Sequence, residues 1–136
     1  MLGIDGCYII DLPEFSDNRG RLSFVETQAH LDFEIKRNYF IYDVPGGEGR
    51  GQHAHKTLHQ FIMCLNGSFE IELYDGKHRK TFFLNKPSTG LYICPLIWRE
   101  LRNFSSGTVC SVLASDIYDA DDYIRTTDEF LAIVND

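Results

Sequence analysis

Residues 69–83, FEIELYDGKHRKTFF, carry the clearest secondary-structure signal of the chain. Phe69, Ile71 and Leu73 alternate with polar residues, and this period of two is typical of a strand that buries one face. Asp75 and Gly76 then form a pair that favours a tight hairpin turn. The stretch therefore predicts two antiparallel strands joined by a short turn.

The same period recurs on both sides of this hairpin. Short apolar runs are separated by glycine-bearing turns such as SDNRG, PGGEGRG, LNGS, NKPSTG and NFSSG. Many short strands with such turns indicate an all-β sandwich or barrel. One short helix is expected at residues 127–134, TDEFLAIV, after a Thr or Asp cap. Further strands are expected at Tyr8–Asp11, Leu22–Glu26, Tyr39–Val44, His59–Leu65, Leu91–Pro95 and Val109–Ser115.

Length and charge narrow the class of protein. A chain of 136 residues predicts a single domain, residues 1–136, that can bury a core without disulfide or metal staples. Its net charge of −7 argues against nucleic acid or an anionic membrane as a partner. No apolar run approaches the length of a membrane helix, and no basic-then-apolar leader opens the chain. We therefore expect a cytoplasmic protein.

The four cysteines lie far apart in the sequence and form no CxxC pair. This spacing supports neither a zinc knuckle nor a thioredoxin-like motif. Cys64 and Cys94 lie in apolar, strand-like runs. We interpret the cysteines as small buried hydrophobic residues.

Residues 49–60, GRGQHAHKTLHQ, hold three of the five histidines. On a strand, His53 and His55 share one face, about 6.6 Å apart along the chain. Histidine titrates near neutral pH, so two imidazoles facing one pocket can take and return a proton. The alternative is a pair of histidines with only a pocket-lining or surface role. The flanking Arg50 and Lys56 and the preceding glycine-rich loop favour a functional pair.

The spacing of Gly47, His53, His55, Gln60 and Gly67 resembles the first sequence motif of the cupins, small β-barrels or jelly rolls with a pocket in the mouth. Metal-binding cupins usually have Glu at the position of Gln60. The region that resembles their second motif, residues 90–107, contains no histidine, which leaves Glu100 as a late ligand and His59 as a poorly placed one. The sequence therefore favours a site without metal.

Longer stretches extend this resemblance over nearly the whole chain. Residues 20–26 (GRLSFVE), 37–68 (RNYFIYDVPGGEGRGQHAHKTLHQFIMCLNGS) and 111–131 (SVLASDIYDADDYIRTTDEFL) resemble the nucleotide-sugar 3,4-ketoisomerases of the cupin superfamily, the WxcM-like or FdtA/QdtA-like proteins. The resemblance implies that dTDP-4-keto-6-deoxyglucose is converted to a 3-keto sugar through an enediol, with no metal or other cofactor. The product would then be aminated at C3. It also implies homodimers that exchange N-terminal strands.

The resemblance assigns roles to three residues. His53 matches the base that removes the C3 proton. His55 would polarise the enediol oxygens or assist proton transfer. Tyr39 matches a tyrosine that passes a proton between the two oxygens, and a phenol can both donate and accept. Taken by itself, Tyr39 would be an ordinary strand aromatic.

A diphosphate substrate needs cations. Arg50 is the first candidate because a guanidinium offers paired donors, and Arg19, Arg99 and Arg102 are further candidates. Trp98 is a candidate for stacking on sugar or thymine, with a core role as the alternative. The aspartates of residues 116–122 are interpreted as structural. The resemblance relates the C4 configuration of the product to positions 19 and 99, where this chain combines two patterns, so the configuration stays open.

Three other functions fit a cupin. A nucleotide-sugar epimerase also transfers protons next to a ketone, but it pairs a single histidine with an aspartate in a longer chain. A sugar-nucleotide-binding cupin without activity would not need Tyr39 beside His53. A metal-dependent dioxygenase would contain stoichiometric metal and lose activity on chelation.

Overall fold

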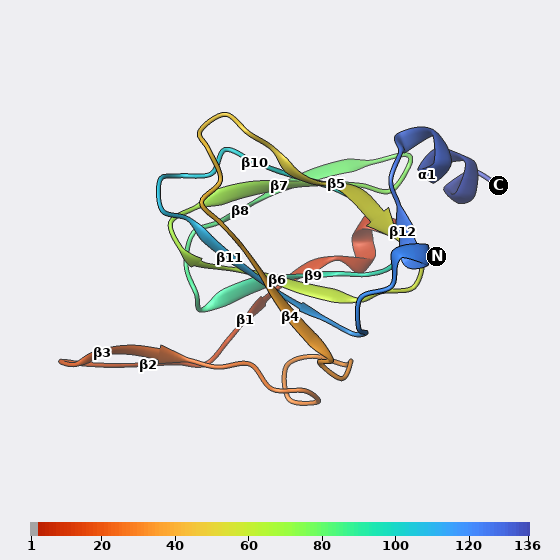
Figure 1. The fold of residues 1–136 in the computed structure, drawn as a ribbon. Helices are drawn as coiled ribbons and strands as arrows, with labels where there is room; N and C mark the ends of the chain where they lie inside the picture. The colour runs from red at the N-terminus through yellow and green to blue at the C-terminus, as the bar shows by residue number, and fades with distance from the viewer. Residues whose placement is uncertain (1–2) are drawn as a thin grey trace.

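Two five-stranded antiparallel sheets face each other in the computed structural model, which describes residues 3–136 (Figure 1). The first sheet has the order β1 (Tyr8–Asp11), β9 (Thr89–Ile93), β6 (Gln60–Asn66), β11 (Val109–Ala114), β4 (Arg37–Tyr42). The second has the order β12 (Tyr123–Ile124), β5 (Arg50–His55), β10 (Trp98–Arg102), β7 (Phe69–Tyr74), β8 (Arg79–Leu84). The remaining elements are β2 (Glu14–Asp17), β3 (Gly20–Ser23), the 3-10 helices η1 (Gly3–Gly6) and η2 (Ala120–Asp122), and α1 (Thr127–Val134).

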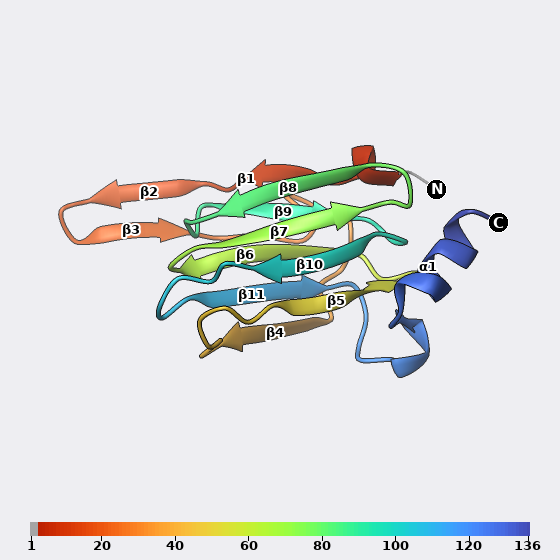
Figure 2. The ribbon, with the colours of Figure 1, turned by 90° about the horizontal axis from the view of Figure 1, so that it is seen from above.

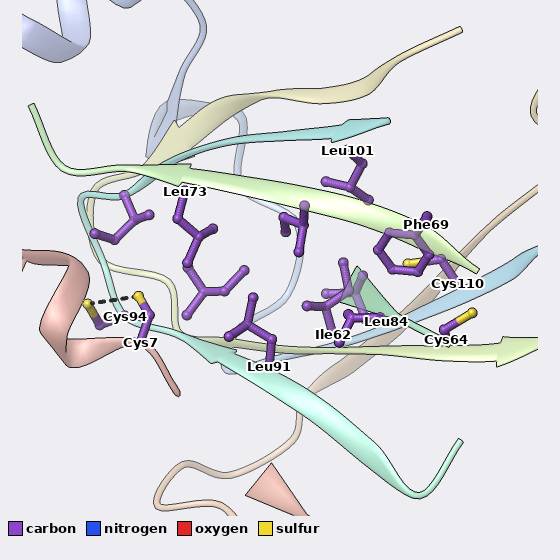
Figure 3. Close-up of a cluster of buried hydrophobic side chains, with 14 of the residues drawn as sticks. Cys7, Ile62, Cys64, Phe69, Leu73, Leu84, Leu91, Cys94, Leu101 and Cys110 are labelled. Atoms are coloured by element: carbon purple, nitrogen blue, oxygen red, sulfur yellow. Dashed lines mark hydrogen bonds between the residues drawn. The ribbon is translucent and has the colours of Figure 1, made fainter. Parts of the chain in front are cut away.

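The main core fills the space between the two sheets (Figure 3). Phe69, Ile71 and Leu73 of β7 are fully buried, as their alternation predicts, and β7 pairs with β8 from Phe69 opposite Leu84 to Tyr74 opposite Arg79. Each such side chain contributes about 1.5–3 kcal/mol by leaving water. All four cysteines are free and buried, which confirms their interpretation as small core residues.

Other segments cover part of the outer face of each sheet. Leu31 and Phe33, in the segment before β4, pack on Phe61 and Met63 of the first sheet. On the second sheet, α1 places Phe130 against Ala54, Trp98 and Ile124. The Thr126 hydroxyl accepts a hydrogen bond from the Glu129 amide and begins this helix, as the sequence predicted. Within residues 3–136, no helix is both long and apolar enough to cross a membrane.

The hairpin of β2 and β3 projects away from the sandwich (Figures 1 and 2). Phe15 and Leu22 on it are 62% and 59% exposed. The sequence predicted the turn but not β2, and it extended the following strand to Glu26, whereas β3 ends at Ser23. Within residues 3–136, no second layer packs on this pair, so the alternation that identifies buried strands is absent there.

Strands β10 and β12 were also not predicted. Trp98–Arg102 lacks a polar-apolar alternation because it buries residues on both faces, with Trp98 under α1 and Arg99 between the sheets. Tyr123–Ile124 is too short to carry a period, and it is a strand only because it pairs with β5. The other predicted strands and the helix are confirmed, with ends shifted by no more than two residues.

Candidate active site

A cavity of about 130 Å³ lies between the two sheets. One part of its wall is polar and includes His53, Tyr39, Gln60, Arg99 and Tyr123. The rest of the wall is apolar. Apolar walls around a few convergent polar groups are typical of a small-molecule site. The apolar lining consists of Ile41, Ile62, Ile71, Ile93, Leu101 and Val112.

His53 and His55 face the same side of β5, as their spacing predicted. Their Nε2 atoms are 3.1 Å apart. His55 is fully buried, and its Nδ1 lies 3.0 Å from Oδ2 of Asp122. The other oxygen of Asp122 accepts hydrogen bonds from the amide and the hydroxyl of Thr57, at 2.8 and 2.9 Å. A carboxylate, a buried imidazole and a cavity-lining imidazole are therefore connected in series.

A β-bulge lies at the start of β5, before the two histidines. Along β10, Arg99 pairs with His53 and Leu101 pairs with Arg50, so two steps on β10 match three on β5. The extra residue is accommodated near Gly51, whose φ of 71° favours glycine. Because paired residues share a face, the bulge places Arg50 on the same side as His53. Arg50 itself is exposed.

The electrostatics keep both imidazoles neutral. Burial is the main cause that lowers the pKa of His53 to about 2, and the positive charge of Arg99 contributes to the same lowering. Burial, Arg99 and Arg37 lower the pKa of His55 to about 3. The carboxylate of Asp122 opposes this lowering, because it accepts the Nδ1–H of His55. Neutral imidazoles at working pH are ready to accept a proton.

A second series of hydrogen bonds runs through Arg99, Gln60 and Tyr39. Arg99 is buried between the sheets, where Nη1 donates to Oε1 of Gln60 and Nη2 donates to the Ile97 carbonyl at 3.1 Å. Nε2 of Gln60 then donates to the Tyr39 hydroxyl at 2.9 Å. Burial raises the pKa of Tyr39, so the phenol keeps its proton near neutral pH.

Two cavity-lining arginines have donor capacity to spare. The Nε atoms of Arg37 and Arg99 are buried, and neither has a hydrogen-bond partner within residues 3–136. Buried donors without partners are rare in folded proteins. A polar or anionic ligand in the cavity would satisfy them.

The predicted binding residues do not all meet at the cavity. Arg99 lines the cavity, but the exposed Arg50 is not among its lining residues, and Trp98 and Arg102 are on the opposite face of β10. Trp98 packs on Phe130, and Arg102 pairs with Glu72 at 3.1 Å. With a period of two, residues 98 and 102 cannot share the face of Arg99, so neither side chain lines this cavity.

Arg19 and His59 lie outside the cavity of their own chain. Arg19 is in the turn of the projecting hairpin and pairs with Asp17 at 2.7 Å. His59 lies against Phe33, with its Nδ1 2.6 Å from the Tyr92 hydroxyl. His59 therefore does not join the histidine pair.

Sequence reasoning missed Asp122 and Tyr123. It treated the aspartates near residue 120 as structural, but Asp122 holds His55. The Tyr123 ring lies 5.1 Å from that of His53 and 4.5 Å from that of His55, with Arg125 on it at 4.4 Å. The pairing of β12 with β5 brings them there across 67 positions. Only the family resemblance of the DDYIR run could have drawn attention to them.

The donor set does not resemble a metal site. Among residues 3–136, no group of three His, Cys, Asp or Glu side chains is arranged to hold a metal ion. Gln60, at the position of the cupin carboxylate, is bound to a guanidinium, and this positive group would repel a cation.

An antiparallel double sheet with a histidine-bearing cavity in its interior defines a cupin. A family model described as FdtA, WxcM-like, C-terminal, matches residues 5–135. The chain is 46% identical over 122 residues to the TDP-4-oxo-6-deoxy-alpha-D-glucose-3,4-oxoisomerase of Aneurinibacillus thermoaerophilus, covering 90% of this chain and 88% of that protein. This chain belongs to the FdtA (WxcM-like, C-terminal) family.

Solved structures agree with this membership. A 3,4-ketoisomerase from Helicobacter canadensis is 48% identical, with a TM-score of 0.93 over 96% of this chain and 98% of that one. QdtA from Thermoanaerobacterium thermosaccharolyticum, a histidine-to-asparagine variant in complex with TDP-4-keto-6-deoxyglucose, is 42% identical, with a TM-score of 0.93 over 95% and 94%. A 4-keto-6-deoxy sugar epimerase from Streptomyces spheroides is 17% identical and shares the fold alone.

Proposed function

We propose that this protein is a nucleotide-sugar 3,4-ketoisomerase that converts dTDP-4-keto-6-deoxyglucose to a dTDP-3-keto-6-deoxyhexose. The observation that carries the proposal is the neutral pair His53 and His55 at a cavity that His53 and Tyr39 both line, in a chain of the FdtA family. The product is a substrate for amination at C3. A cytoplasmic location stays a prediction.

The first half of the reaction breaks the C3–H bond. His53 takes this proton, the electron pair forms the C3=C4 double bond, and the C4 oxygen gains a proton to give the enediol. His53, as the group that lines the cavity, is the base. Arg99, close to the same space, would stabilise the negative charge that develops on the oxygens.

The second half returns the protons. C4 receives the proton from His53, while the C3 hydroxyl loses its own and becomes the new ketone. Tyr39 carries a proton between the two oxygens, and its phenol can accept from one as it donates to the other. His55 supports His53 through the contact between their Nε2 atoms. Atoms and electrons balance without an oxidant or a reductant, so no redox cofactor takes part.

The diphosphate is assigned to Arg50, an exposed residue on the strand that carries His53. A guanidinium is suited to this because it presents paired donors to phosphate oxygens. Arg37 is added to the proposed binding set, because it lines the cavity with a buried donor left free by residues 3–136.

The proposed assembly is a homodimer that exchanges its N-terminal hairpins. The projecting β2–β3 hairpin exposes Phe15 and Leu22. A groove of about 500 Å³ beside its base is lined by Met63 and Leu65 of the first sheet, and Leu65 is exposed. A partner's hairpin would cover such surface. Arg19 at the hairpin tip would then reach the other subunit, where it could influence the product configuration. Sedimentation equilibrium would test the dimer, and a monomer at micromolar concentration would contradict it.

The activity is tested by proton NMR of the protein with dTDP-4-keto-6-deoxyglucose in deuterated water. A 3-keto product is expected, and its C4 signal would give the gluco or galacto configuration. Deuterium in C3 or C5 without carbonyl migration would identify an epimerase instead. Nucleotide binding without any change in the sugar would identify a binding protein. Either result would overturn the proposal.

A further inference from the structure

Two rows of hydrogen-bonded side chains, called here the histidine series and the tyrosine series, end at the same cavity. Each row begins at a charged side chain, and the two charges are opposite. One begins at the carboxylate of Asp122 and ends at His53. The other begins at the guanidinium of Arg99 and ends at Tyr39. We propose that these anchors assign the proton roles before substrate binds: Asp122 makes His53 an acceptor, and Arg99, through Gln60, makes Tyr39 a donor. The inference rests on the proposed isomerase function, which it deepens by naming two positioning residues, Asp122 and Gln60.

The orientation of the histidine series follows from donor capacity. Asp122 accepts from the amide and hydroxyl of Thr57, so its carboxylate acts as an acceptor. His55 must then donate from Nδ1. A neutral imidazole carries one N–H, so Nε2 of His55 accepts, and Nε2 of His53 has to donate to it. The remaining nitrogen of His53, Nδ1, is left with a lone pair.

That lone pair is available to a ligand. His53 lines the cavity, and no group within residues 3–136 forms a hydrogen bond with its Nδ1. When Nδ1 takes a proton, the charge of the imidazolium is shared through His55 toward Asp122. The series therefore prepares the resting His53 to act first as a base, before it returns the same proton to C4.

The directions of the hydrogen bonds in the tyrosine series follow from the same reasoning, but this series begins at a donor instead of an acceptor. A guanidinium can only donate, so it fixes the Gln60 amide with Oε1 toward Arg99. Nε2 of Gln60 then faces Tyr39 and donates to its oxygen. With that acceptor site used, the phenol directs its own proton elsewhere, and Tyr39 lines the cavity. A glutamate at this position, as in metal-binding cupins, would instead accept the Tyr39 proton.

Nitrogen-15 NMR of histidine-labelled protein at pH 7 tests the first series without substrate. We expect His55 as the Nδ1–H tautomer and His53 as the Nε2–H tautomer. In Asp122→Asn, the Thr57 contacts hold Oδ1, so Nδ2 of the amide faces His55 and both tautomers should reverse. Asp121→Asn is the matched control, because Asp121 is exposed and its side chain contacts neither histidine. The opposite tautomers in the unchanged protein would overturn the inference, even if the variant failed to fold.

Steady-state kinetics test the second series. Gln60→Glu should lower kcat about 100-fold and change KM less than threefold, because the Tyr39 proton is withdrawn from the cavity. Gln52→Glu makes the same change at an exposed site on β5 and should be neutral. An unchanged kcat in Gln60→Glu would overturn the role of Gln60. If the unchanged protein has no isomerase activity, the proposed function fails, whereas the tautomer measurement still stands by itself.

Discussion

The space between the two sheets divides into a packed part and a cavity, and the same strands supply both. On β6, Gln60 faces the cavity, whereas Cys64, four residues along on the same face, is in the core (Figure 3). On β7, Ile71 lines the cavity and Phe69 fills the packed part. The packed part needs only apolar volume, which many sequences supply. The cavity needs particular donors and acceptors in fixed directions, so a single atom can decide its function.

The largest expected effect is a loss of kcat caused by a substitution in the cavity. His53→Asn should lower kcat about 1,000-fold or more, because the base is lost while the shape is kept. Binding of TDP should survive. His78→Asn, an exposed histidine outside both parts, serves as the control. Retained turnover in His53→Asn would remove His53 as the base.

A substitution in the packed part should have the opposite result, a loss of stability with little change in kcat. Phe69→Ala should lower the free energy of unfolding by about 3–5 kcal/mol, because a fully buried ring leaves a cavity. The kcat of the folded fraction should stay within about twofold. Urea unfolding and assays well below the midpoint measure the two quantities. A large loss of kcat at unchanged stability would show that the two parts are not separable.

A smaller effect is expected on the opposite wall. Tyr39→Phe should lower kcat about 100-fold, less than the loss of His53, since a water molecule can carry a proton between oxygens but does not replace the carbon base. The variant also leaves the Nε2 donor of Gln60 without its partner. Initial rates of 3-keto sugar formation measure this. An unchanged rate would assign the transfer to His55 or water.

The two histidines at the cavity should make the free energy of unfolding decrease at low pH, whereas the apolar residues of the packed part should not. The pKa values of His53 and His55, about 2 and about 3, lie below the unfolded value near 6.5, so between about pH 6.5 and 3 these two histidines gain protons only in the unfolded chain. Stability is therefore complete above pH 6.5 and falls as the pH drops toward 3. Each histidine contributes up to about 1.4 kcal/mol per pH unit. Urea unfolding at pH 7 and 5 should show a shallower loss in His53→Asn; identical losses would contradict the neutral, buried state.

The smallest expected effect is that of metal removal, which should leave the activity unchanged. Incubation with EDTA and dialysis should leave kcat unchanged, because Arg99 and Gln60 occupy the region where a cupin metal would need anionic ligands. Activity lost on chelation and restored by one added metal would show that the cavity is a metal site after all.

Sequence reasoning was most accurate where one strand face is simply buried. The alternation of Phe69, Ile71 and Leu73 predicted β7, and the His53–His55 spacing predicted a shared face. It was inaccurate where neighbouring layers decide burial. Trp98, predicted to bind substrate, lies under α1 and outside the cavity. Strand β2 was missed because no layer within residues 3–136 covers the hairpin.

The sequence by itself determined the all-β class, the C-terminal helix and the histidine pair, because each depends on periods of a few residues. Only the tertiary structure decided what holds that pair. Asp122 meets His55 across 67 positions, and Arg99 meets Gln60 across 39. No local pattern encodes such pairs, because sheet register and the bulge at Gly51 set their directions. Proton transfer depends on those directions, so the fold had to be known before the base and the acid could be told apart.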